Sequence, residues 1–168
     1  MPGEVAEFGF DQVARLVEKP EYKDSVVLVA SASTGGEGEG ALISEVALHE
    51  KRPSHIILRA TKMLSQSDWM GRHYTLLYQT PEQVMGFLRS IPVGIVVVHN
   101  QRGLPGTLDH QLLRQAISVY SAEWERLGTY SEAESTIDVY RLKSAAGRRI
   151  GKIHVDLPYT LGHSIELQ

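Results

Sequence analysis

The side chains best suited to binding a ligand follow three separate apolar segments of the chain. Each segment leads directly into hydroxyl, basic or amide side chains. Arg and Lys can offset the charge of an anionic group, and Ser, Thr and Asn can replace the water contacts that a polyhydroxylated group loses on binding. We therefore predict one ligand-binding site formed by the residues Ser31, Ser33, Thr34, Arg59, Thr61, Lys62, His99 and Asn100.

A glycine-rich stretch follows the first of these segments. Gly36, Gly38 and Ala41 have the spacing of a loose dinucleotide fingerprint, in which glycines let a pyrophosphate approach the amides at a helix N-terminus. However, Glu37 and Glu39 place negative charge where the phosphate would lie, and no acidic residue follows the second segment to hold a ribose. The pattern favours a flexible turn, and a neutral sugar or a protein partner over a phosphate.

Patterns for a catalytic or metal centre are weak. The seven histidines include no HxxxH or HxH pair and no HExxH motif, which favours scattered surface histidines over a metal site. No GxSxG elbow presents a serine nucleophile. The carboxylate pairs Glu37/Glu39 and Glu132/Glu134 lie in expected loops, without the apolar surroundings that raise a pKa. We predict no catalytic residue, no cofactor and no metal.

The composition is that of an ordinary globular domain. A chain of 168 residues buries roughly 70% of its unfolded surface without a metal or disulfide. Its 17 basic and 20 acidic residues form no concentrated patch, which disfavours nucleic acid, and the absence of cysteine excludes disulfides and thiolate chemistry. The N-terminal segment lacks the features of a signal peptide, and no apolar run reaches the roughly 18 residues that span a bilayer. We expect a soluble chain with no direct membrane insertion.

Hydrophobic periodicity predicts the elements that position the candidate site. Val26–Ala30, His55–Ala60 and Val93–Val98 have the nearly continuous apolar character of parallel strands covered on both faces. Thr80 and Pro81 are typical of a helix start, and amphipathic helices alternate with the strands. Because the carboxyl ends of parallel strands meet at one edge, the eight candidate residues should lie together there.

The last third of the chain changes character. Trp124–Tyr130, Thr136–Leu142 and Lys152–Leu157 are strand-like segments with no helix between them, so we expect antiparallel strands added at one sheet edge. Tyr74–Tyr78 is a further short strand. No repeat or long linker divides the chain. The prediction is a single domain, residues 1–168, with a three-layer α/β fold and an open, largely parallel sheet that gains antiparallel strands at its C-terminal edge.

The order of these elements resembles a known family. A glycine-rich turn, then HIILRATKMLSQSDW, then YTLLYQTPEQVMGFLRSIPVGIVVVHN, and finally a helix and the strand TIDVYRL, over about residues 8–142, are similar to one kind of α/β domain. This is the soluble C-terminal domain that follows the membrane helices in polytopic glycosyltransferases of the dolichyl-phosphate-mannose mannosyltransferase type. The most specific part is TPEQVMGFLRSIPVGIVVV, where such domains often have a threonine-proline-acid cap and a "vdYvvv"-like strand. Pro92-Val93-Gly94 replaces that strand pattern here.

The resemblance implies a non-catalytic accessory domain. In those enzymes the catalytic carboxylates and the lipid-phosphate site belong to the membrane portion, so no catalytic residue carries over to this chain. The implied partner is a membrane glycosyltransferase or a glycan acceptor, and the implied location is extracytoplasmic; without such an origin the chain would be cytoplasmic. Two other classes stay open, namely a small protein or enzyme that binds a sugar or sugar phosphate at the carboxyl edge, and a protein assembly module.

Overall fold

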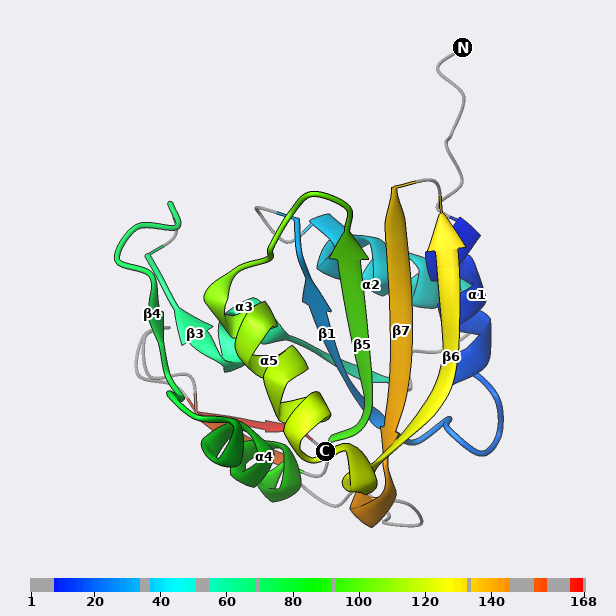
Figure 1. The fold of residues 1–168 in the computed structure, drawn as a ribbon. Coiled ribbons are helices and arrows are strands. Elements are labelled where there is room, and N and C mark those ends of the chain that lie inside the picture. Colours follow the sequence, from blue (N-terminus) through cyan, green and yellow to red (C-terminus); the bar gives the residue numbers. More distant parts are fainter. Residues whose placement is uncertain are drawn as a thin grey trace.

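The molecule is built on a five-stranded sheet with the strand order β2-β1-β5-β7-β6 (Figure 1). The computed structural model describes residues 8–33, 37–50, 55–68, 70–91, 93–132, 134–145, 153–156 and 164–167. The sheet strands are β1 (Val26–Ser31), β2 (Ile56–Arg59), β5 (Val93–Gln101), β6 (Trp124–Glu132) and β7 (Ser135–Leu142). Strand β1 pairs in parallel with β2 and β5, whereas β7 is antiparallel to both β5 and β6. The predicted sheet with antiparallel strands at its C-terminal edge is confirmed.

Helices cover the two faces of this sheet and complete three layers (Figure 1). The helices are α1 (Phe8–Val17), α2 (Glu37–His49), α3 (Ala60–Met63), α4 (Pro81–Ser90) and α5 (Leu108–Val119). Alternate residues of β1 enter separate cores: Val27 and Val29 pack with α1 and α2, while Leu28 and Ala30 pack with α3, α4 and α5. Successive side chains of a strand point to opposite faces of the sheet. Because both faces of β1 are buried, every residue of the strand is apolar or small, which gives a continuous apolar run.

The start of α4 follows the predicted capping chemistry. The Thr80 hydroxyl accepts a hydrogen bond from the backbone N–H of Gln83 at 3.2 Å, and Pro81 occupies the first turn. The Gln83 side chain reaches back to accept from the backbone N–H of Gln79 at 2.7 Å, one residue before the position that a capping box uses. Two free amide donors are thereby satisfied by neighbouring side chains.

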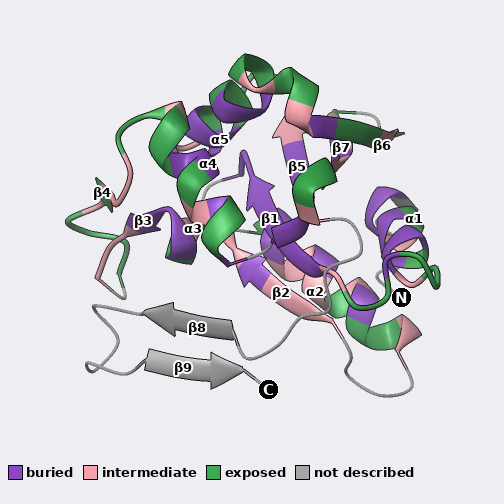
Figure 2. Ribbon diagram, turned by 90° about the horizontal axis from the view of Figure 1, so that it is seen from below, coloured by how far each residue is buried: buried purple, intermediate pink, exposed green. Residues whose placement is uncertain are grey.

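Strand β2 is less buried than its apolar sequence predicts. Ile56, Ile57 and Arg59 are intermediate in exposure, and only Leu58 is buried, as the mixed colouring of β2 in Figure 2 shows. The expectation of complete cover on both faces holds for β1 and for most of β5 but is wrong for β2. The reason is position, because β2 is the last strand of the sheet on its side.

Two further predicted strands belong to small separate sheets rather than to the main sheet. Strand β4 (Thr75–Leu76), within the predicted Tyr74–Tyr78 strand, pairs with β3 (Ser65–Gln66). Strand β8 (Ile153–Asp156), within the predicted Lys152–Leu157 strand, pairs with β9 (Ser164–Leu167). Pairing with a nearby segment costs less loop-closure entropy than joining a distant sheet edge. The expectation that Lys152–Leu157 extends the C-terminal edge is therefore wrong.

The remaining elements are short. Two 3₁₀ turns, η1 (Ser121–Glu123) and η2 (Lys143–Ala145), precede β6 and follow β7. Within the described ranges, none of the helices has the length and apolar character needed to cross a bilayer.

Candidate functional site

The carboxyl ends of the parallel strands bring most of the predicted site residues to one edge of the sheet. Ser31 in β1 lies directly opposite His99 in β5, and Arg59 in β2 lies opposite Val29 in β1. The arrowheads of β1 and β5 point to the same end in Figure 1, where α2 begins. Residues separated by up to 68 positions in the chain thus share one rim. Of the predicted set, Thr34 lies outside the described residues.

Ser31, Ser33 and His99 form a buried hydrogen-bonded group at this rim. The Ser31 hydroxyl oxygen lies 2.9 Å from His99 Nδ1 and 2.7 Å from the Ser33 hydroxyl oxygen, and it accepts from the Ser33 backbone N–H at 3.2 Å. A serine hydroxyl has one donor and two acceptor positions, so these three contacts use its full capacity. Ser31 is only 2% exposed, and the His99 ring packs on Phe10 of α1 with 5.3 Å between ring centroids. The group is closed to a ligand from outside.

Gly38 explains why the first turn of α2 can approach this group. A Cβ atom at Gly38 would lie 2.6 Å from both His99 Nδ1 and the Ser31 hydroxyl oxygen, which no real Cβ contact permits. The space that the dinucleotide fingerprint reserves for a pyrophosphate is therefore filled, at Gly38, by side chains of the protein itself. The backbone N–H of Gly38 lies 3.4 Å from the Ser33 hydroxyl oxygen, so this serine also serves the helix start.

Glu39 joins Arg59 and Thr61 into a second internal group beside the first. Its carboxylate accepts from Arg59 Nε at 2.9 Å, from the Thr61 hydroxyl at 2.8 Å and from the Thr61 backbone N–H at 3.2 Å. The Glu39 side chain is completely buried, whereas the Arg59 side chain is 38% exposed. The expectation that Glu39 projects charge towards a ligand is wrong, because Arg59 and Thr61 satisfy it inside the fold. We refer to Ser31, Ser33, Glu39, Arg59, Thr61 and His99 as the rim cluster.

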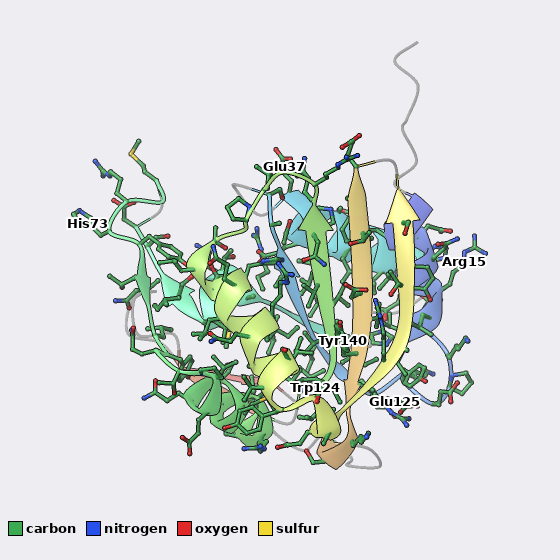
Figure 3. The ribbon with its side chains drawn as sticks, viewed as in Figure 1. Arg15, Glu37, His73, Trp124, Glu125 and Tyr140 are labelled. Atoms are coloured by element: carbon green, nitrogen blue, oxygen red, sulfur yellow. The ribbon has the colours of Figure 1, made fainter. Side chains whose placement is uncertain are left out.

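Three charged or amide groups of the same edge lie apart from the rim cluster. Glu37 is exposed at the start of α2, at the upper edge of the molecule in Figure 3. Lys62, on α3, is also exposed. Asn100 follows His99 in β5, so its side chain points to the opposite face of the sheet. The predicted site is therefore divided between two faces of the sheet rather than gathered in one place.

Asn100 belongs to a polar surface that the sequence analysis did not identify. Its amide Nδ2 donates to Asp138 Oδ2 at 3.2 Å, and Asp138 Oδ1 accepts from Arg126 Nη2 at 2.5 Å and from the Thr129 hydroxyl at 2.7 Å. Figure 1 shows α5 beside β5 and no helix in front of β7 and β6. We call the residues Asn100, Arg126, Thr129, Asp138 and Tyr140 the open sheet face.

The alternation of β7 shows why this face is open. Ile137 and Val139 are buried against α1 and α2, whereas Asp138 and Tyr140, which point the other way, are only partly buried. An antiparallel strand with one covered and one solvated face has this pattern, and it was visible in the segment STIDVYRL. The same alternation places Asp138 and Tyr140 on the polar face of the strand.

Tyr140 gives the open sheet face an aromatic component. Its ring packs edge-on against Trp124, with 6.4 Å between ring centroids, at the lower end of the sheet in Figure 3. Burial and the nearby Asp138 carboxylate raise the pKa of Tyr140, so its hydroxyl stays protonated and can donate a hydrogen bond. An aromatic ring beside a carboxylate and hydroxyl groups suits a polar ligand that also has apolar surface.

The N-terminal end of α5 contributes a third polar group. His110 Nε2 donates to the backbone carbonyl of His99 at 3.0 Å, and burial lowers the pKa of His110. The Tyr74 hydroxyl donates to Asp109 Oδ1 at 2.5 Å, and burial together with this carboxylate raises the pKa of Tyr74 to about 12. Both contacts tie α5 to its surroundings, and a neutral His110 supports the strand end that carries His99 and Asn100.

Neither a protein-family model nor a curated protein matches the sequence.

Proposed function

We propose that this chain is a non-catalytic accessory domain that contacts a sugar or glycan acceptor through the open sheet face, as in the domain of membrane glycosyltransferases that its sequence resembles. The observation that carries the proposal is the difference in burial between the two groups of polar residues, the rim cluster and the open sheet face. Ser31, Ser33, Glu39 and His99 of the rim cluster are buried. On the open sheet face, by contrast, Arg126 and Thr129 are exposed and hydrogen bond to the partly buried Asp138.

A neutral polyhydroxylated ligand fits this surface better than a phosphate. Asp138 lies at its centre and accepts hydrogen bonds from three side chains, and its negative charge would repel a phosphate. Sugar hydroxyls can both donate to this carboxylate and accept from Arg126 and Thr129.

A serine hydrolase is less well supported by the same geometry. A nucleophilic serine must be reachable by its substrate, but Ser31 is buried and its hydroxyl has no hydrogen-bonding capacity to spare. The contact between Ser31 and His99 is therefore interpreted as structural support for the strand ends.

Binding can be tested by NMR titration of the labelled chain with mannose, short mannose oligosaccharides and mannose phosphate. We expect chemical-shift changes confined to β6, β7 and the end of β5, with the neutral oligosaccharides binding more tightly than the phosphate. Asp138→Asn and Thr129→Ala should each weaken binding about tenfold, as the loss of a hydrogen bond to a charged or polar partner predicts. Thr75→Ala, an exposed threonine on β4, is the matched control and should leave the affinity unchanged.

Two results would overturn the proposal. One is the absence of shift changes at high millimolar concentrations of every sugar. The other is binding whose shift changes lie on the rim cluster or on α1 and α2, with unchanged affinity in Asp138→Asn.

A further inference from the structure

Three side chains with metal-binding chemistry come together between α1 and α2. Asp11 of α1 and Glu45 and His49 of α2 each offer one ligand atom, and these atoms all lie within 4.8 Å of one another. Asp11 Oδ1 and His49 Nε2 are 2.7 Å apart. All three residues are intermediate in exposure, so an ion could reach them from solvent. This α1/α2 cluster shares no residue with the rim cluster or the open sheet face.

The arrangement has a local and a tertiary component. Glu45 and His49 are four residues apart in a helix, and this spacing places both side chains on the same face. Asp11 is contributed by α1, which packs against α2 in the layer behind the sheet (Figure 1). The spacing of histidines alone could not reveal the cluster, because two of its three residues are carboxylates and one lies 38 positions away from His49.

We propose that the α1/α2 cluster is a binding site for a divalent transition metal, with Zn²⁺ as the best match. Zinc is bound in proteins by His nitrogen and by Asp and Glu oxygen, and three protein ligands leave a fourth position for water. Mg²⁺ and Ca²⁺ prefer oxygen ligands alone, so the imidazole selects against them.

The distances are compatible with this ion. Zinc binds nitrogen and oxygen ligands at about 2.0–2.2 Å, so in a tetrahedral site the ligand atoms are roughly 3.4 Å apart. The ligand atoms of the cluster all lie within 4.8 Å of one another, and the Asp11–His49 contact of 2.7 Å is shorter than this value. Small side-chain rotations would open the Asp11–His49 contact and draw Glu45 inwards.

Arg15 supplies the supporting contact that such a site needs. Its Nε donates to Asp11 Oδ2 at 3.0 Å, leaving Oδ1 directed at His49. Outer contacts of this kind orient a metal-binding carboxylate. The side chain of Arg15 lies on α1 at the side of the molecule, well away from the sheet face that carries Tyr140 (Figure 3). A bound ion would join α1 to α2 and so stabilise the helical layer that covers the core around Val27 and Val29.

Isothermal titration of the complete chain with zinc chloride tests the site, and the visible absorption of Co²⁺ reports the ligand geometry. We expect one ion per chain and a rise in Tm of roughly 5–10 °C at a hundredfold excess over Kd. His49→Gln and Glu45→Gln should each raise the zinc Kd more than tenfold, because even the loss of an outer contact costs 10–100-fold in affinity.

Matched controls separate this site from adventitious binding by other histidines and carboxylates. His73→Asn removes an exposed histidine at a φ of 56°, a conformation that asparagine tolerates, and Glu82→Gln removes an exposed carboxylate of α4. Both should keep the affinity of the unaltered chain. The proposal is overturned if zinc does not bind, or if His49→Gln and Glu45→Gln bind it as tightly as the two controls do. Neither His49→Gln nor Glu45→Gln alters the open sheet face. The zinc titration therefore tests this site independently of sugar binding.

Discussion

The rim cluster and the open sheet face lie at neighbouring positions of one sheet but differ in their exposure to solvent. In the parallel half, helices cover both faces of β1 and β5, so Ser31, Ser33 and His99 are buried and hydrogen bond to one another. The buried Glu39 is paired with Arg59 and Thr61 at the partly covered end of β2. In the antiparallel half, β6 and β7 have one covered face, and the polar groups of the other remain in contact with solvent. Polar residues at a strand end therefore do not indicate a ligand site unless it is known whether helices cover that end.

Glu39→Ala should produce the largest loss of stability, because it breaks the rim cluster at its buried charge. We expect a decrease of roughly 3 kcal/mol in the free energy of unfolding, the low end for removing one partner of a buried pair, since Arg59 is partly exposed and can be solvated. Urea denaturation measures this change. A decrease below about 0.5 kcal/mol, which is usual for surface substitutions, would show that the cluster is not the internal support described here.

Gly38→Ala should be the next most damaging change. The new Cβ would lie 2.6 Å from His99 Nδ1 and the Ser31 hydroxyl oxygen, so we expect a loss of about 1–3 kcal/mol from overpacking. Gly40→Ala in the same helix is the matched control, because nothing lies within 4 Å of its added Cβ. Alanine there should be neutral or stabilise by up to about 1 kcal/mol. Equal effects of the two substitutions in thermal unfolding would refute the close approach at Gly38.

Replacing His110 should alter the dependence of stability on pH. Burial lowers the pKa of His110 below its ordinary value of 6.5, so the unfolded chain binds this proton more readily than the folded chain. Its effect on stability is absent above pH 6.5, and stability is lost as the pH falls through 6.5 towards the lower folded pKa. The free energy of unfolding of His110→Gln, measured from about pH 5 to 7.5, should therefore fall less steeply towards acid than that of the unaltered chain. An unchanged slope in His110→Gln would contradict the assignment.

Thr129→Ala should have the smallest effect on stability, because Thr129 is exposed on the open sheet face. We expect a change within about 0.5 kcal/mol, in contrast to Glu39→Ala. The same urea denaturation series provides the comparison. A loss as large as that of Glu39→Ala would mean that Thr129 and Asp138 support the fold rather than present a binding surface.

The purified chain should show no glycosyl transfer at all. The rim cluster offers no accessible nucleophile at Ser31, and the resemblance places the catalytic groups of such enzymes in their membrane portion. Incubation with a lipid-phosphate sugar and an acceptor, followed by product analysis, measures the activity. Transfer that a single substitution in this chain abolishes would refute a non-catalytic role.

The amino-acid sequence by itself determined the local elements and much of the architecture. Thr80 and Pro81 mark the start of α4, the run Val93–Val98 marks a buried strand, and STIDVYRL alternates as an antiparallel strand. These features depend on contacts between residues close in the chain, or on a hydrophobic period of two or 3.6 residues. Both can be identified from the amino-acid sequence alone. The shared edge of Ser31, Arg59 and His99 also followed, because parallel strands must align their carboxyl ends.

Only the tertiary structure decided what the polar residues do. Whether Glu39 faces solvent or Arg59, whether Asn100 meets Asp138, and whether Asp11 meets His49 all depend on contacts between residues 20 to 38 positions apart. The pairing of β8 with β9, in place of the main sheet, depended likewise on competition between alternative partners. Local periodicity fixes which way a side chain points from its own element, but the energy of a polar group depends on what the rest of the chain places beside it.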